Sequence, residues 1–362
     1  RRRGGPGGGG SAGSMDTLFM SEQGWRDFVR SLSRRMRIVH PEAHGEHYHL
    51  VPPPPGGDRP PATGSRYRAV QSLKTLLFEA RLDVGGYLGG EGDAAGGGGA
   101  PGGPQAVIGV KGCDVRALKV LDFVFGGDSP DPFYAANRER TLVISSDCTA
   151  FKDVCFCTLV GGKPYPEDGY DLNLSPVRGG YLVRAGSPRG RALMKEAGGL
   201  FVPPDAAQRG EAAAARERVA ALLEDRQRAL GYQWGGATRE LMERVYESEV
   251  WAREAERCVE CGACNFVCPT CHCFLLSDHG RGRFRRVRNW DACQYKGFAR
   301  VGGGANPRPE LYQRLRNRYE KKFHFCPVVM GVCGCTGCGR CVEACIGGID
   351  MREVLKELSG CK

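Results

Sequence analysis

Two short apolar runs predict buried strands near the middle of the chain. AVIGV at 106–110 and TLVIS at 141–145 are almost entirely apolar or small, a pattern typical of strands covered on both faces. Residues 114–125 between them carry a helical pattern. Residues 169–187 predict two strands around a turn of proline and glycine. We therefore expect an α/β domain over residues 15–200.

Helical patterns predict most of the remaining elements. Residues 204–230 and 236–256 are rich in Ala, Glu, Arg and Leu, and in 309–323 an apolar residue recurs at every fourth position. The expected fold class is therefore α+β, in which a helical connector at 201–235 joins the α/β domain to a helical domain at 236–362. The apolar positions of the helical stripes are Trp25, Phe28, Val29 and Leu32 near the start of the chain, and Leu311, Leu315, Tyr319 and Phe323 further on.

Three segments are too rich in glycine and proline to predict packed elements. Residues 52–64 and 85–104 are expected to be loops, and residues 1–14 an unstructured leader or a cloning scar ahead of Met15. None of these glycines forms a G-x-G-x-x-G run between a strand and a helix. The sequence therefore predicts neither a flavin nor a nicotinamide bound by this chain.

Composition narrows the classes of protein that remain. The 362 residues are 41% hydrophobic and 25% charged, and the mean hydropathy is −0.36. No run approaches the roughly 20 apolar residues of a membrane-spanning helix, so we do not expect an integral membrane protein. The formal net charge is +10, and between Arg281 and Lys322 thirteen Lys and Arg residues face only three acidic ones.

Three interpretations of that basic segment stay open. It can be a solvated basic face, a surface that docks an acidic partner, or a source of positive charge that compensates anionic thiolate clusters. Nucleic-acid binding is not expected, because the segment contains no recognisable nucleic-acid motif and lies between groups of cysteines.

Eighteen cysteines in a chain of this length point to metal chemistry. CVECGACNFVCP at 258–269 has the C-x2-C-x2-C-x3-C-P spacing of bacterial [4Fe–4S] proteins, and CTGCGRCVEAC at 335–345 repeats it. In such runs three thiolates from one loop bind one cluster and the fourth binds the other, whereas zinc sites normally use paired C-x2-C units. The predicted ligand sets are Cys258, Cys261, Cys264 and Cys345 for one cluster, and Cys335, Cys338, Cys341 and Cys268 for the other.

Four further cysteines follow the predicted strands of the α/β domain. Because loops after neighbouring strands converge at one edge of a sheet, these cysteines are candidates for a third [4Fe–4S] cluster. The alternative is that they are small buried residues. The four candidates are Cys113, Cys148, Cys155 and Cys157.

Three other cysteines lie near the first motif. Cys271, Cys273 and Cys293 either hold a further centre or pack beside the clusters. We prefer packing, with His272 as a hydrogen-bond donor near the clusters rather than a ligand.

The order of these motifs resembles one family. GVKGCDVRALKVLDFVF, DPFYAANRERTLVISSDC, CFC and GYDLNL are followed by CVECGACNFVCPTCHCF, NWDAC, GGGANPRP and GCTGCGRC. The chain resembles the iron–sulfur β subunits of cytoplasmic NAD(P)-linked [NiFe] hydrogenases of the sulfhydrogenase type, and the related iron–sulfur subunit of anaerobic sulfite reductase. It departs from them at Ile346, where proline is frequent, and at the additional Cys326 and Cys333.

This resemblance implies an electron-transfer subunit. Its partners would be a flavin subunit that oxidises NAD(P)H and a catalytic subunit of the hydrogenase or sulfite-reductase kind. It also implies the N-terminal cysteine set matched by Cys113, Cys148, Cys155 and Cys157. Two alternatives stay open: an iron–sulfur enzyme with its own substrate-binding cluster, and the electron-input subunit of a disulfide-reductase-type complex. With no secretory h-region and many thiolates to keep reduced, we expect a cytoplasmic protein.

Overall fold

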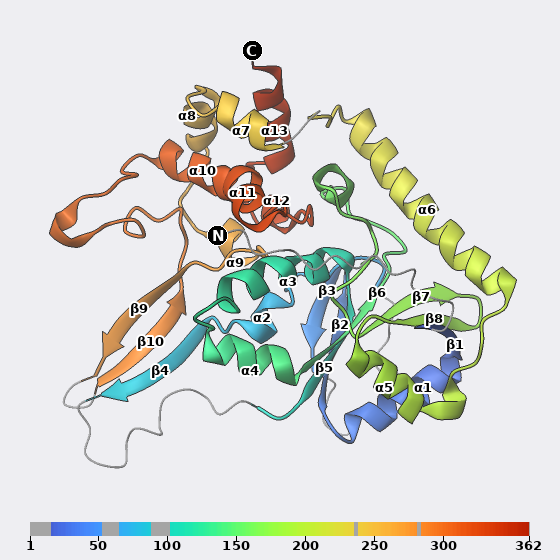
Figure 1. Ribbon diagram of the computed structural model, residues 1–362. Coiled ribbons are helices and arrows are strands. Elements are labelled where there is room, and N and C mark those ends of the chain that lie inside the picture. The colour runs from blue at the N-terminus through green and yellow to red at the C-terminus, as the bar shows by residue number, and fades with distance from the viewer. Residues whose placement is uncertain (1–15, 53–64, 88–101, 235–237, 281–283, 362) are drawn as a thin grey trace.

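The computed structural model describes residues 16–52, 65–87, 102–234, 238–280 and 284–361. Its N-terminal part is built on a seven-stranded sheet with the order β1-β8-β7-β6-β5-β2-β3 (Figure 1). The four central strands β2, β5, β6 and β7 are parallel, and the outer strands pair antiparallel. The bounds are β1 Thr17–Ser21, β2 Arg37–His44, β3 His47–Val51, β5 Gln105–Val110, β6 Thr141–Ser146, β7 Leu172–Val177 and β8 Gly180–Ala185.

Helices cover both faces of this sheet, as the buried apolar runs predict. Ala106 and Ile108 of β5 pack with α1 (Glu22–Ser33) and α5 (Pro188–Glu196), whereas Val107 and Val110 pack on the opposite face. That second face is covered by α2 (Lys74–Leu77), α3 (Gly112–Phe125) and α4 (Pro132–Arg140). The α1 stripe of Trp25, Phe28, Val29 and Leu32 is buried, which confirms that sequence prediction.

A long helix leads out of this sheet. α6 (Ala206–Ala229) begins at a capping box, in which the Asp205 carboxylate accepts from the Gln208 backbone amide and the Gln208 side-chain carbonyl accepts from the Asp205 backbone amide. It runs diagonally past β7 toward the helices of the C-terminal part of the chain (Figure 1). Arg216 on α6 pairs with Asp147 after β6 at 2.7 Å, which fixes the helix to the carboxyl edge of the sheet.

The C-terminal part is a layer of short helices around its own apolar core. Trp251, Tyr319, Phe323 and Leu355 are fully buried there, and Leu315 is buried beside them. The expected helix at 309–323 forms as α10 and continues through wider π-helical turns at Lys321–Phe325. The helices are α7 Thr238–Arg244, α8 Val250–Ala255, α9 Ala263–Phe266, α10 Leu311–Glu320, α11 Cys326–Met330, α12 Arg340–Glu343 and α13 Met351–Gly360; short 3₁₀ turns lie at Cys157–Val160, Gly198–Leu200 and Gly302–Gly304.

A second sheet joins the two parts of the chain, and the sequence did not predict it. β4 (Arg81–Tyr87) pairs antiparallel with β10 (Phe284–Trp290), which pairs with β9 (Phe274–His279). The loop expected over 85–104 is therefore wrong at residues 85–87, and the expected helical domain contains a β-hairpin. Pairing between strands some 200 residues apart leaves no local pattern. Residues 1–14, 53–64 and 88–101, where leader and loops were expected, lie outside the described residues.

The helices differ from the sequence prediction at two places. The helix expected over 236–256 is divided into α7 and α8, and α4 was not expected.

In the described part of the chain, no helix is both long enough and apolar enough to cross a membrane. The mixed α+β class with C-terminal helices agrees with the expectation from sequence.

The joining sheet generates a stability prediction. The Arg288 side chain is 4% exposed, pairs with Asp131 and lies 4.6 Å over the Phe78 ring, whereas Arg285 is 68% exposed and pairs with Asp83 at 3.3 Å. Because breaking a buried pair leaves an uncompensated charge, Arg288→Met should lower the free energy of unfolding by about 3 kcal/mol. Arg285→Met should change it by less than about 1 kcal/mol. Urea titration of anaerobic protein measures both, and equal effects would contradict the assignment.

Candidate iron–sulfur centres

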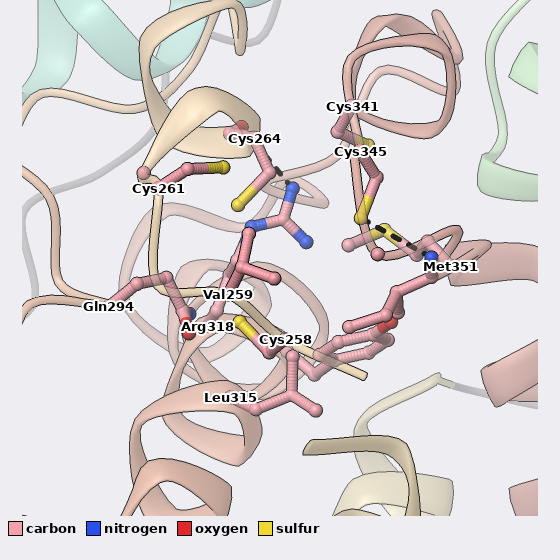
Figure 2. Close-up of a pocket in the computed structure, with 14 residues that line it drawn as sticks. Cys258, Val259, Cys261, Cys264, Gln294, Leu315, Arg318, Cys341, Cys345 and Met351 are labelled. Atoms are coloured by element: carbon pink, nitrogen blue, oxygen red, sulfur yellow. Dashed lines mark hydrogen bonds between the residues drawn. The ribbon is translucent and has the colours of Figure 1, made fainter. Parts of the chain in front are cut away.

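The first predicted ligand group surrounds one cavity. Set 1 is Cys258, Cys261, Cys264 and Cys345, and all four line a cavity with about 530 Å³ of empty space (Figure 2). Cys258 and Cys261 come from the loop that enters α9, Cys264 lies in the first turn of α9, and Cys345 follows α12. Gly262 makes the loop possible: its φ is 71°, and a Cβ there would lie 2.7 Å from the Tyr295 hydroxyl. Burial raises the pKa of the Cys264 thiol to about 11.

The second predicted group lies deeper. Set 2 is Cys268, Cys335, Cys338 and Cys341, and the first three are 8% exposed. Burial raises the pKa of Cys341, and the nearby charges of Cys338 and Cys268 add to the increase. Burial likewise raises the pKa of Cys335, with a contribution from Cys341. Cys341 therefore lies within electrostatic reach of the other three thiols. It also lines the cavity of set 1, so the division into two ligand sets stays a prediction from the spacing.

The carboxyl edge of the large sheet gathers the third candidate group. Set 3 is Cys113, Cys148, Cys155 and Cys157; Cys113 lies in the first turn of α3 after β5, and Cys148 follows β6. Burial raises the pKa of Cys157 well above its usual range, and the charges of Cys155 and Cys148 add to this. The pKa of Cys148 rises to about 12, again chiefly through burial. Loops from separate strands thus bring these thiols together at one place.

Sets 2 and 3 meet through direct backbone contact. The Phe156 amide donates to the Gly337 carbonyl at 2.7 Å. A Cβ on Gly337 would lie 2.4 Å from the Cys157 Cα, and one on Gly339 would lie 2.2 Å from the Val154 carbonyl oxygen. Only glycine permits this approach and the positive φ angles of 65° and 70°. The loop of the second motif is therefore packed against the loop that carries half of set 3.

The three remaining candidates fall into separate pairs. The proximity of Cys268 raises the pKa of the Cys271 thiol, and the proximity of Cys293 raises the pKa of the Cys273 thiol. The Asn265 amide also donates to Cys293 Sγ at 3.0 Å. Cys271, Cys273 and Cys293 therefore do not form one three-thiol group.

Single-metal sites are not found where the structure describes the chain. Among these residues, no three or more His, Cys, Asp or Glu side chains are arranged to hold one metal ion. His272 is engaged elsewhere: its Nδ1 lies 3.0 Å from the Thr270 carbonyl oxygen, and its ring contacts Phe125 edge-on.

Buried cations lie beside the thiols without carboxylate partners. Arg318 is 4% exposed and donates to the Cys264 carbonyl at 3.4 Å, and its Nε has no hydrogen-bond partner among the described residues. Figure 2 shows its guanidinium between the Cys261–Cys264 side of the cavity and the Cys341–Cys345 side. Burial alone would lower the pKa of Arg318, yet the charges of Cys264 and Cys341 hold it well above its usual range.

Two buried lysines also lie beside thiols without forming an ion pair among the described residues. Lys322 Nζ donates to Cys268 Sγ at 3.2 Å, to Thr270 Oγ1 at 2.9 Å and to the Gly334 carbonyl at 3.2 Å. Lys111, beside set 3, donates to the Ser65 and Asp147 carbonyls and the Ser146 hydroxyl. Within the described part of the chain, neither forms an ion pair with a carboxylate.

These cations test whether the sets fit an anionic cluster. An unpaired charge in the interior costs several kcal/mol, so each cation requires negative charge close by. Beside Arg318 and Lys322 the described structure places the thiols of sets 1 and 2 and of Cys271, with the Tyr319 phenol also close to Arg318. Beside Lys111 lie the thiols of Cys148 and Cys113 together with the carboxylates of Asp147 and Asp114. Iron ligated by thiolates supplies such charge. The residues therefore fit iron–sulfur clusters.

The described part of the basic segment contains both buried and exposed cations, and Arg285, Arg286, Lys296 and Arg300 are among the exposed ones. Arg288, Arg316, Arg318 and Lys322 are buried, as is Arg314, so these residues do not form a solvated or docking face. Arg314 and Arg316 pair with Glu260 and Glu247, at 2.9 and 3.2 Å. Charge compensation is the interpretation that Arg318 and Lys322 support. No local pattern in the sequence distinguished these two from their paired neighbours.

Comparison with known proteins agrees with this geometry. A family model described as a 4Fe-4S dicluster domain matches residues 257–349. The beta subunit of sulfhydrogenase 2 from Pyrococcus furiosus is 31% identical over 258 residues, which cover 71% of this chain and 74% of that protein. The chain belongs to the sulfhydrogenase β-subunit family. This confirms the resemblance drawn from the motifs, and it makes the protein an iron–sulfur electron-transfer subunit; the number of clusters and their ligands stay predictions.

Set 3 leads to a prediction about the number of irons bound per chain. If sets 1, 2 and 3 each bind one [4Fe–4S] cluster, fully loaded protein should contain about 12 irons per chain. Cys155→Ser should remove about four of them and leave the other two clusters spectroscopically intact. Cys361→Ser is the matched control, because that thiol contacts Ser248 and the end of α13 rather than any set. Iron analysis and EPR measure both, and about eight irons in loaded wild-type protein would make set 3 ordinary buried thiols.

Proposed function

We propose that this chain relays electrons through three [4Fe–4S] clusters held by sets 1, 2 and 3. The observation that carries the proposal is the continuity of the sets. Arg318 lies between thiols of sets 1 and 2, and the loops of sets 2 and 3 share a backbone hydrogen bond at Gly337. Each cluster would accept and release one electron with little rearrangement of the protein.

The two ends of this series are accessible and differ in chemistry. At set 1 Cys261 is exposed, and Val259 and Ile346 beside it are 59% and 77% exposed. At set 3 a cavity reaches Cys113 and Cys157, and charged residues of both signs line its wall. Lys119 and Lys163 pair there with Asp168 and Glu167, and Arg116 lies beside them. Two different partners can therefore approach opposite ends.

The partners belong to the same proposal. Together with the sulfhydrogenase β relative, the two ends support a complex in which a flavin subunit oxidises NAD(P)H and a catalytic subunit resembles a hydrogenase or a sulfite reductase. Cys271, Cys273 and Cys293 then pack beside the clusters in their separate pairs. All eighteen cysteines are free thiols, which fits a reducing compartment, and we propose the cytoplasm.

Reconstitution tests the relay directly. The isolated chain, reduced by dithionite, should take up electrons but should not oxidise NAD(P)H or H₂ or reduce sulfite. Addition of a flavoprotein partner should allow NAD(P)H to reduce the clusters, as followed by absorption and EPR. Turnover of any of these substrates by the isolated chain would overturn the relay in favour of an enzyme with its own substrate-binding cluster.

A surface substitution tests the end at set 1. Ile346→Asp places a charge in the exposed apolar rim, so binding of the partner at this end should weaken about tenfold or more, which corresponds to about 1.4 kcal/mol. Iron content should not change, because the side chain is exposed. Leu222→Asp is the control, since that side chain is 53% exposed on α6, which carries none of the three sets. Titration of each variant with the partner measures the affinity, and equal weakening by both would contradict the assignment.

A further inference from the structure

The middle position in the relay has an unusual concentration of buried positive charge. Two cations of one helical stretch lie beside set 2 without carboxylate partners in the described structure. Lys322 donates to Cys268 Sγ at 3.2 Å, and Arg318 lies close enough to Cys341 for the two charges to interact strongly. Both cations project from one continuous helical stretch, α10 and the π-helical turns that follow it.

The flanking sets have less unpaired positive charge. Set 1 shares Arg318, but the Arg314 charge near it is paired with Glu260, which lies between Cys258 and Cys261 in the sequence. Set 3 has the unpaired Lys111, while Arg340 is paired with Asp114 at 2.9 Å. Among the described residues, Arg318 is therefore the unpaired cation at set 1, and Lys111 and Arg116 lie at set 3 without an ion pair. Set 2 has Arg318 and Lys322, with Lys74 close to Cys268 as a third.

Electrostatics converts this difference into an order of potentials. Reduction adds one negative charge to a cluster, so a nearby fixed cation stabilises the reduced form and raises the potential. Burial by itself disfavours the added electron, but a low-dielectric interior also strengthens the attraction of the two cations at set 2. Arg318 touches both ferredoxin-type sets, whereas Lys322 touches set 2 alone.

Building on the proposed relay, we propose that Arg318 and Lys322 make the cluster at set 2 the one of highest potential. The first electron to enter the chain then resides in the middle of the series, away from both exposed ends. Arg318 and Lys322 thus determine, through their charges, at which cluster this electron resides. Each end can exchange electrons with its partner while the central site stays charged.

An anaerobic potentiometric titration of the full-length holoprotein, followed by EPR, tests this order without prior assignment of the signals. Lys322→Met should shift one midpoint potential downward. Arg318→Gln should shift the same potential and one more. In wild-type protein, the signal moved by both substitutions should be the first to appear on reduction. Arg318→Lys, which keeps the charge, should restore most of the Arg318→Gln shift.

Arg316→Gln is the matched control, because Arg316 lies on the same helix and is 8% exposed but is paired with Glu247. It should leave every potential unchanged. The inference is overturned if Lys322→Met moves no potential, or if the doubly affected signal is not the first reduced. Should Arg318→Gln lose iron, the Lys322→Met and Arg318→Lys titrations still decide. Failure of the proposed relay would look different: wild-type protein would then lack three reducible cluster signals.

Discussion

The need to neutralise buried cations organises the C-terminal half of this protein. Arg318 and Lys322 have no carboxylate partner in the described structure, and both contact or face thiols. Their burial is tolerated only when anionic sulfur ligands lie beside them. Arg314 and Arg316 lie on the same helix and are instead neutralised by ion pairs with Glu260 and Glu247. The difference between these pairs marks where iron–sulfur clusters belong.

A second constraint holds the two halves together at the centre of the relay. Gly337 and Gly339 bring the second cysteine motif into backbone contact with the loop at 154–157. The sheet β4-β10-β9 ties the halves at another point through main-chain pairing and the buried Arg288–Asp131 pair. With both attachments in place, the order of the thiol sets is a property of the fold rather than of flexible domains.

Cysteine spacing and strand patterns predicted most of the site. The C-x2-C-x2-C-x3-C spacing predicts that three thiols from one tight loop bind a cluster together with a fourth thiol from the other motif. The structure places the four thiols of set 1 around one cavity, which Cys341 also lines, so the assignment of ligands stays a prediction. Set 3 followed from the convergence of strand ends. Pairing of β4 with β10 and the lack of a carboxylate near Arg318 in the described structure are non-local facts, so no sequence window could reveal them. The charge run at 281–322 was visible in the sequence, but the burial of Arg318 and Lys322 within it was not.

The central claim is that three thiol sets bind clusters in one continuous series. Anomalous scattering at the iron absorption edge, from crystals grown without oxygen, tests it most directly. The account predicts three iron peaks, one at each of the three sets, with the set 2 peak between the other two. A map with iron only at sets 1 and 2, or with a peak among Cys271, Cys273 and Cys293, would contradict it.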